Sequence, residues 1–226
     1  MLAAFSFAPQ WLVTPMTAVL AWFLSFTGSY GLSIILLTLA LRVLILPLTI
    51  YQTKSMKRMQ EVQPLMKEIQ EKYKDQPDKL NKEMMGLYKS QGVNPFSGCL
   101  PMLIQMPFLY AIFAVVNNFK PEAHHASPIF IGINLMLPDP HFILPAITVI
   151  AMFAQSYLSG MGNDPNQKMM TYLMPLVFGY ITFRMPAGVV LYWVVSTVFG
   201  LAQQAIYPGF PRLTGAQGPK GEAKRQ

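Results

Sequence analysis

Long apolar runs with few charges recur along this chain of 226 residues, and they restrict its fold more than any other feature. Several runs contain about 17–25 residues, the length that a helix needs to cross roughly 30 Å of hydrocarbon. Only 12% of the residues are charged, which is half the share of about 25% that is usual in soluble domains. The sequence therefore predicts an all-α integral membrane protein.

The apolar runs divide into five expected membrane spans. These spans are residues 30–53, 94–119, 138–158, 169–185 and 186–207. The segment 54–93 is strongly polar, and its apolar residues recur at spacings of three or four, as in an amphipathic helix. Pro77 interrupts this pattern, which predicts a helical hairpin, and Pro64 predicts a kink in the first of its two helices.

Lysine and arginine are concentrated in three polar segments. Nine of the 17 lie in residues 54–93, four lie in the tail 208–226, and one lies in the loop 159–168. The positive-inside rule makes these segments cytoplasmic, and it places the loop 120–137 and the N-terminus outside. Six acidic residues also lie in residues 54–93, which favours a solvated helical face over the alternative, a nucleic-acid-binding surface.

The first 29 residues contain no Lys, Arg, Asp or Glu. Residues 15–27 are apolar but short for a span, and they include Trp22 and Phe23. We predict an interfacial helix on the outer surface within residues 1–29. A sixth span is the alternative, and it would place the uncharged N-terminus inside.

Arg42 lies inside the apolar run of the first span, and we expect no carboxylate at its depth. Its guanidinium stays charged, at a cost of about 2.5–3.5 kcal/mol at the bilayer centre. In a straight helix it lies about 13 Å from Tyr51, in the cytoplasmic half of the span. A water-filled pocket open to the cytoplasm would hydrate this charge and attract a mobile carboxylate. The alternative is a structural role, in which Arg42 caps carbonyls at a helix break or reaches the headgroups.

Other polar residues in the spans repeat at separations of four and seven, which places them on one face of each helix. They are Thr38 and Thr49 in the first span, Gln105 in the second, Thr148 and Gln155 in the third, and Trp193, Ser196, Thr197, Gly200, Gln203 and Gln204 in the fifth. We expect these faces to point into the bundle, because polar groups avoid lipid. Hydrogen bonds between helices are their common role.

The chain contains no sequence motif typical of a catalytic site. G-x-S-x-G, a phosphate-binding loop and H-E-x-x-H are all absent, so we expect no enzyme and no cofactor. The three histidines, His124, His125 and His141, have no matching cysteine or carboxylate cluster, so we expect no metal site.

Three segments resemble the YidC-type membrane protein insertases, whose relatives include the oxidase-assembly insertases of mitochondria and the Albino proteins of thylakoids. The segments are TLALRVLILPLT (38–49), MMGLYKSQGVNPFSGCLPMLIQMP (84–107) and PAGVVLYWVVS (186–196). The resemblance extends over about residues 15–207. It implies five spans around a hydrophilic groove that is open to the cytoplasm and to lipid but closed outside, in a bacterial cell (inner) membrane.

The resemblance also assigns positions in this groove. The residues that match the family pattern are Arg42, Thr38, Gln105, Tyr192 and Trp193, and the inward polar faces add Gln155 and Ser196 as candidate groove residues. The segment 54–93 matches a cytoplasmic hairpin that the family requires for activity.

The function that follows is insertion and folding of nascent membrane proteins with short translocated tails, independently of the Sec translocon or together with it. The ribosome and the signal recognition particle receptor are further candidate partners, although the basic tail is short. One alternative is an anion channel or carrier that uses Arg42 as its binding charge. Another is a chaperone that assists folding and assembly without insertion.

Overall fold

The computed structural model describes residues 9–94, 100–158 and 165–206, and most of these residues are helical. The α-helices are α1 (Gln10–Thr27), α2 (Tyr30–Leu44), α3 (Leu46–Lys72), α4 (Pro77–Ser90), α5 (Leu100–Asn118), α6 (Ile143–Leu158), α7 (Pro165–Thr182) and α8 (Ala187–Ile206). Between α5 and α6 lie a 3-10 turn, η3 (Pro121–His124), and an antiparallel pair of short strands, β1 (Ile129–Phe130) and β2 (Ile133–Asn134). The predicted tail 208–226 lies outside the described residues.

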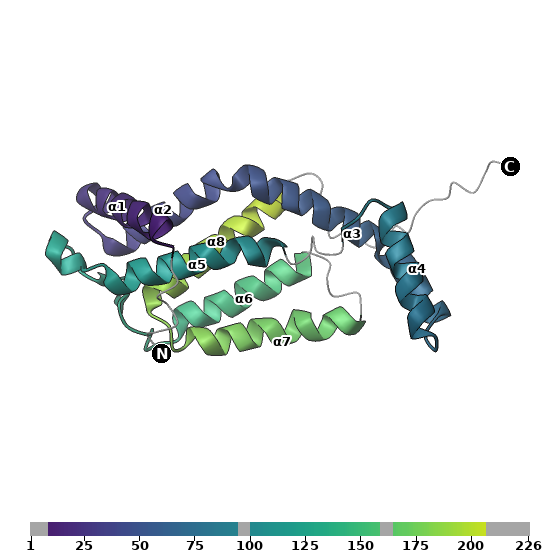
Figure 1. Cartoon of the computed structure of the whole chain (residues 1–226). Helices are drawn as coiled ribbons and strands as arrows, with labels where there is room; N and C mark the ends of the chain where they lie inside the picture. The colour runs from purple at the N-terminus through teal and green to yellow at the C-terminus, as the bar shows by residue number, and fades with distance from the viewer. Residues whose placement is uncertain (1–8, 95–99, 159–164, 207–226) are drawn as a thin grey trace.

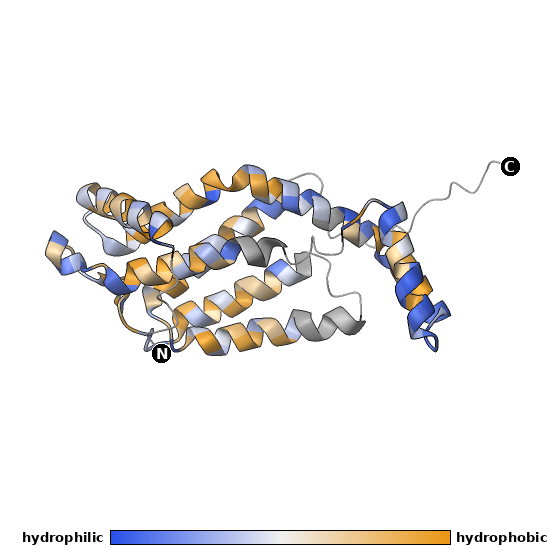
Figure 2. Ribbon diagram, viewed as in Figure 1, coloured by the Kyte–Doolittle hydropathy of each residue, from blue (hydrophilic) through white to orange (hydrophobic). Residues whose placement is uncertain are grey.

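The helices form a bundle with a hairpin that extends from one end (Figure 1). Helix α8 packs against α2, α5 and α6, while α7 packs against α6, and α1 packs against α2 and α5. Helices α3 and α4 pack against each other and form the extending hairpin. Figure 2 shows apolar residues throughout the bundle and hydrophilic residues along α4 and the adjoining part of α3. The predicted helical hairpin is therefore present, with its turn immediately before Pro77.

The first span is bent, which corrects the straight helix assumed from the sequence. Helix α2 ends at Leu44, Ile45 is not helical, and the following part of α3 is inclined by 60° to α2. Pro47 explains the break, because proline has no N–H to donate and its ring collides with the carbonyl group four residues earlier. The 13 Å estimate for Arg42 therefore does not hold. Helix α3 continues to Lys72 without interruption at Pro64.

By length and composition, α8 is able to cross a membrane, and α2 with the first part of α3 is able to do so as one bent span. Helices α6 and α7 contribute the shorter apolar segments Ile143–Ser156 and Tyr172–Thr182. The number of five spans remains a prediction.

Helix α6 begins later than the span 138–158 expected from the sequence. Asp139, near the start of that range, lies in the preceding loop and is buried. Its Oδ1 accepts a hydrogen bond from the His141 N–H at 3.0 Å, and its Oδ2 accepts one from the Leu144 N–H at 2.8 Å. The carboxylate thus satisfies backbone donors near the start of α6 that no helical carbonyl reaches.

A close-packed core lies where the N-terminal halves of α2 and α8 meet the C-terminal part of α5. Tyr30, Ile34, Val116 and Val190 are each at most 1% exposed. The loop after β2 covers the start of α8, and the N–H groups of Ala187 and Gly188 each donate to a loop carbonyl, those of Leu137 and Leu135, at 2.8 Å. These contacts satisfy donors of the first helical turn. The side chains of this core are therefore tightly packed.

Candidate functional site

Arg42 occupies the last turn of α2, immediately before the helix break. The last carbonyl groups of a helix lack intrahelical donors and carry partial negative charge, so a cation is favourable there. The side chain is half-buried, neither sealed in the core nor fully exposed. Among the residues that the structure describes, no carboxylate pairs with it, and the hydroxyl group of Tyr192 lies nearby.

Arg42, Tyr192 and Gln105 form one polar cluster from three helices, α2, α8 and α5. Gln105 Nε2 donates a hydrogen bond to the Tyr192 hydroxyl oxygen at 2.7 Å. The Arg42 guanidinium lies near the same hydroxyl group. Tyr192 is only 3% exposed, so its orientation is fixed by packing. The amide of Gln105 thus holds a buried hydroxyl group beside a cation.

Ser196 extends the cluster along α8, one turn after Tyr192. Its side chain is buried, and it lies beside the Tyr192 hydroxyl. Within the described residues, Ser196 Oγ makes no hydrogen bond of regular geometry. A buried hydroxyl group without a regular partner retains hydrogen-bonding capacity, which water or a bound polar group could satisfy.

The other candidate residues face different neighbours. Thr38 is fully buried, and its hydroxyl donates to the Ile34 carbonyl of its own helix at 2.7 Å. Trp193 is half-buried, and its ring centroid lies 4.6 Å from that of Phe178 in α7. Adjacent residues on a helix point about 100° apart, which explains why Trp193 packs against α7 while Tyr192 faces Arg42.

Gln155 lies on α6 opposite Gly200 of α8. A Cβ atom at Gly200 would lie 3.5 Å from Gln155 Nε2, which is ordinary van der Waals contact, so the amide group lies close to the α8 backbone. The structure therefore brings Arg42, Gln105, Tyr192 and Ser196 together, and it places Gln155 at the α6–α8 contact.

A second polar contact joins α3 to α8. The hydroxyl group of Thr49 and the side-chain amide of Gln203 form a hydrogen bond, with 3.1 Å between Gln203 Nε2 and Thr49 Oγ1. The sequence placed both residues on polar faces but did not assign them to the site. Gln52 was not predicted to lie on the polar face, although it is 4% exposed and its Nε2 has no partner among the described residues. Its position three residues after Thr49 could have indicated that it shares this face.

Together, these features define a helical membrane protein with a polar cluster inside its bundle. The family model described as 60Kd inner membrane protein matches residues 22–210. The chain belongs to this family, which confirms the resemblance to the YidC-type proteins.

Named relatives agree with this assignment. The chain is 44% identical over 191 residues to a membrane protein insertase YidC of Wolinella succinogenes, covering 84% of this chain and 35% of that protein. It is 40% identical over 208 residues to a membrane protein insertase YidC 2 of Bacillus anthracis, covering 88% and 80% of the two chains. It also spans about a third of the length of two other relatives that share this name.

A solved structure also has the same fold. It is described as an active YidC insertase crystal structure with the first transmembrane domain resolved. The TM-score is 0.73 at 27% sequence identity, and the match covers 88% of this chain and 46% of the other. Both the fold and the sequence thus relate this chain to membrane insertases.

Proposed function

We propose that this protein inserts nascent membrane proteins with short translocated tails and assists their folding. The main support for this proposal is the position of Arg42. Its cation is half-buried at a helix break and pairs with no carboxylate in the described part of the chain. A permanent charge of this kind attracts the carboxylate of a passing tail. The names of the relatives support the same function.

In this proposal, Arg42, Gln105, Tyr192 and Ser196 line a hydrated groove within five membrane spans, open to the cytoplasm and to lipid. The packed core around Ile34 closes the outer end. A polar tail enters the groove instead of bare hydrocarbon, which avoids a desolvation cost of several kcal/mol or more. The apolar span of the substrate then leaves sideways into lipid, driven by roughly 25 cal/mol per Å² of apolar area removed from water.

The orientation in this proposal places the N-terminus outside and the C-terminus in the cytoplasm. The hairpin α3–α4 then faces the cytoplasm, where nine of the 17 lysines and arginines lie between Lys54 and Lys89. From there it meets the nascent chain, either directly or beside the Sec translocon. The same surface is where the ribosome and the signal recognition particle receptor would approach.

The closed core favours insertion over the alternative of an anion channel or carrier. A channel needs a continuous path, and a carrier needs a site that opens to each side in turn. The packed side chains at the start of α2 and α8 oppose such a path. An insertase requires access only from the cytoplasm and from lipid.

Reconstitution of the full chain in liposomes without the Sec translocon tests the proposal. The substrate is a single-span protein with a short acidic tail, and the readout is protection of the tail from external protease. We expect protection that increases with the amount of the chain, and none in empty liposomes. Chloride flux without tail protection would instead support the channel.

A further inference from the structure

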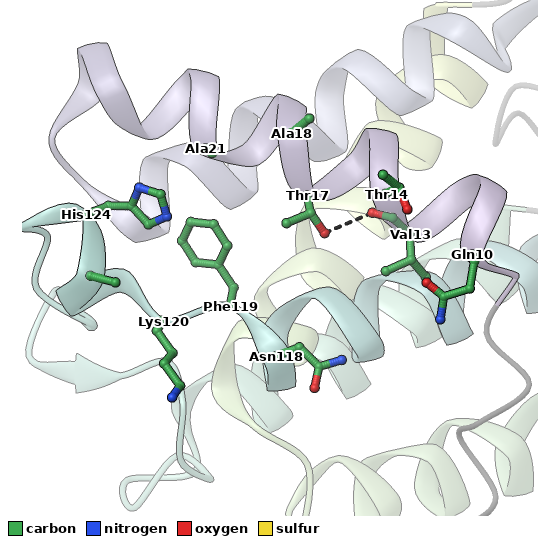
Figure 3. Close-up of a pocket in the computed structure, with 11 residues that line it drawn as sticks. Gln10, Val13, Thr14, Thr17, Ala18, Ala21, Asn118, Phe119, Lys120 and His124 are labelled. Atoms are coloured by element: carbon green, nitrogen blue, oxygen red, sulfur yellow. Dashed lines mark hydrogen bonds between the residues drawn. The ribbon is translucent and has the colours of Figure 1, made fainter.

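A cavity lies away from the Arg42 cluster, between α1 and the segment that runs from the end of α5 into η3. Its volume is about 660 Å³, within the range typical of sites for small molecules. Figure 3 shows the two walls: Thr14 and Thr17 belong to α1, and Asn118 and Lys120 belong to the opposite segment. The proposed groove does not include any of these residues.

The polar groups that line the cavity fit an anion. Lys120 supplies a positive charge, and Gln10 and Asn118 supply amide donors. No acidic residue lines this cavity, and no carboxylate pairs with Lys120 among the residues that the structure describes. The hydroxyl of Thr17 already donates to the Val13 carbonyl at 2.9 Å, so the amide groups and the lysine are the available donors.

A stack of three rings fixes one edge of the cavity. Phe119 lies between Tyr30 and His124, with centroid distances of 5.6 Å and 5.0 Å and interplanar angles of 2° and 3°. His124 is exposed, but this stack orients its imidazole at the cavity edge. The histidine is therefore a positioned ring with nitrogen atoms available for hydrogen bonding.

The aromatic face of α1 indicates the surroundings of the cavity. Trp11, Trp22 and Phe26 are 75%, 62% and 61% exposed, although they are large aromatic residues. On a helix with 3.6 residues per turn, this face lies beside the face that lines the cavity. Tryptophan and other aromatic residues are typical of the headgroup level of a membrane. The exposed aromatic face beside the cavity is therefore typical of a helix at headgroup level.

We propose that this cavity binds the headgroup phosphate and glycerol region of an anionic phospholipid. The phosphate lies at the rim of the cavity, where the flexible Lys120 side chain, directed away from α1 in Figure 3, turns toward it, while the glycerol region faces His124 and the apolar part contacts Val13 and Ala21 of α1. Such a lipid would bridge α1 and η3, because each supplies one wall. The inference requires a membrane location but not insertase activity, so the two proposals can fail independently.

Nuclear magnetic resonance of histidine-labelled protein tests this site, because the chain has only three histidines. The full chain in neutral detergent is titrated at constant pH with dihexanoylphosphatidylglycerol, dihexanoylphosphatidylcholine or inorganic phosphate. We expect a saturable shift of the His124 signal with phosphatidylglycerol and a weaker response to the other two probes. His141, outside the cavity lining, should not respond.

Two variants and one control make the test specific. Lys120→Gln should weaken the apparent affinity about two- to fivefold, as expected for loss of an exposed charge pair. Ala21→Phe should abolish the shift by narrowing the cavity between α1 and His124, and an unchanged thermal midpoint would show that the variant is folded. Lys79→Gln, an exposed change in α4, should leave the affinity unchanged. Three results would each overturn the proposal. They are a response that does not saturate, a response to phosphatidylglycerol no larger than that to either other probe, and equal effects of the two lysine variants.

Discussion

The charge of Arg42 should determine how fast acidic tails are inserted. Arg42→Ala removes the charge and Arg42→Glu reverses it, while Arg42→Lys keeps a point charge on a flexible chain. We expect Arg42→Lys to retain most activity, because a cation is sufficient to attract a carboxylate. Arg42→Ala should slow insertion, and Arg42→Glu should slow it further because it repels the tail.

The partial burial of Arg42 sets the size of this effect. Two opposite charges about 5 Å apart attract by roughly 0.8 kcal/mol in water and by about 3 kcal/mol at an effective dielectric constant of about 20. A half-buried guanidinium lies between these limits. If the attraction acts in the rate-limiting step, its loss slows insertion by about 4-fold to about 150-fold.

The assay compares initial rates of tail protection in proteoliposomes for substrates whose tails carry two aspartates or two asparagines. The matched control is Arg184→Ala, because Arg184 is exposed at the end of α7 and bonds to Tyr180 rather than to the cluster. Between these two alanine variants, only Arg42→Ala should lose insertion rate, and only with the acidic tail. A wild-type rate for Arg42→Ala with the acidic tail would refute the electrostatic role. Equal losses of rate with both tails would indicate a structural role.

Three further predictions concern packing, the helix break and the hairpin. Gly188→Val should lower the thermal unfolding midpoint, because a Cβ atom would lie 3.1 Å from the Leu135 carbonyl oxygen, and overpacking costs about 1–3 kcal/mol. Gly86→Ala, with open space around its Cβ, should not lower the midpoint in the same calorimetric measurement. Pro47→Ala should restore an N–H donor and straighten the break, which would increase the distance between spin labels on α2 and α3; an unchanged distance would contradict this reasoning. Burial raises the pKa of the Tyr88 hydroxyl above its ordinary value of 10.0, so the unfolded chain releases this proton at lower pH than the folded chain. Its contribution to stability should therefore fall as the pH rises through about 10, and circular dichroism melts should show less loss in Tyr88→Phe.

Local chemistry was sufficient to predict several features from the sequence. The apolar periodicity of residues 54–93, interrupted at Pro77, predicted two helices and the turn between them. The family resemblance brought Arg42, Gln105 and Tyr192 together as candidates before their contacts were known. The hairpin prediction depended on spacing and residue type, which the sequence displays directly, whereas the grouping of the three polar residues depended on the resemblance.

Features that depend on long-range packing were not predicted. The β1–β2 pair fits against α2 because Gly31 has no side chain where Phe130 lies, and nothing local to either residue indicates this contact. The break at Ile45 had a visible signal in Pro47, but an apolar run of sufficient length was interpreted as straight. Trp193 was grouped with Tyr192 because the family resemblance matches both residues to one aromatic pair, and the structure adds that the Trp193 ring packs against Phe178 of α7.

The continuity of α3 has a mechanical consequence. Its 27 residues run as one helix from the break beside Arg42 to the turn of the hairpin, a length of about 40 Å at 1.5 Å per residue. A rotation of about 10° at the break would move the far end by roughly 7 Å, by the same geometry. A force on the tip of the hairpin would therefore act on the helical turn that contains Arg42 through a long lever arm.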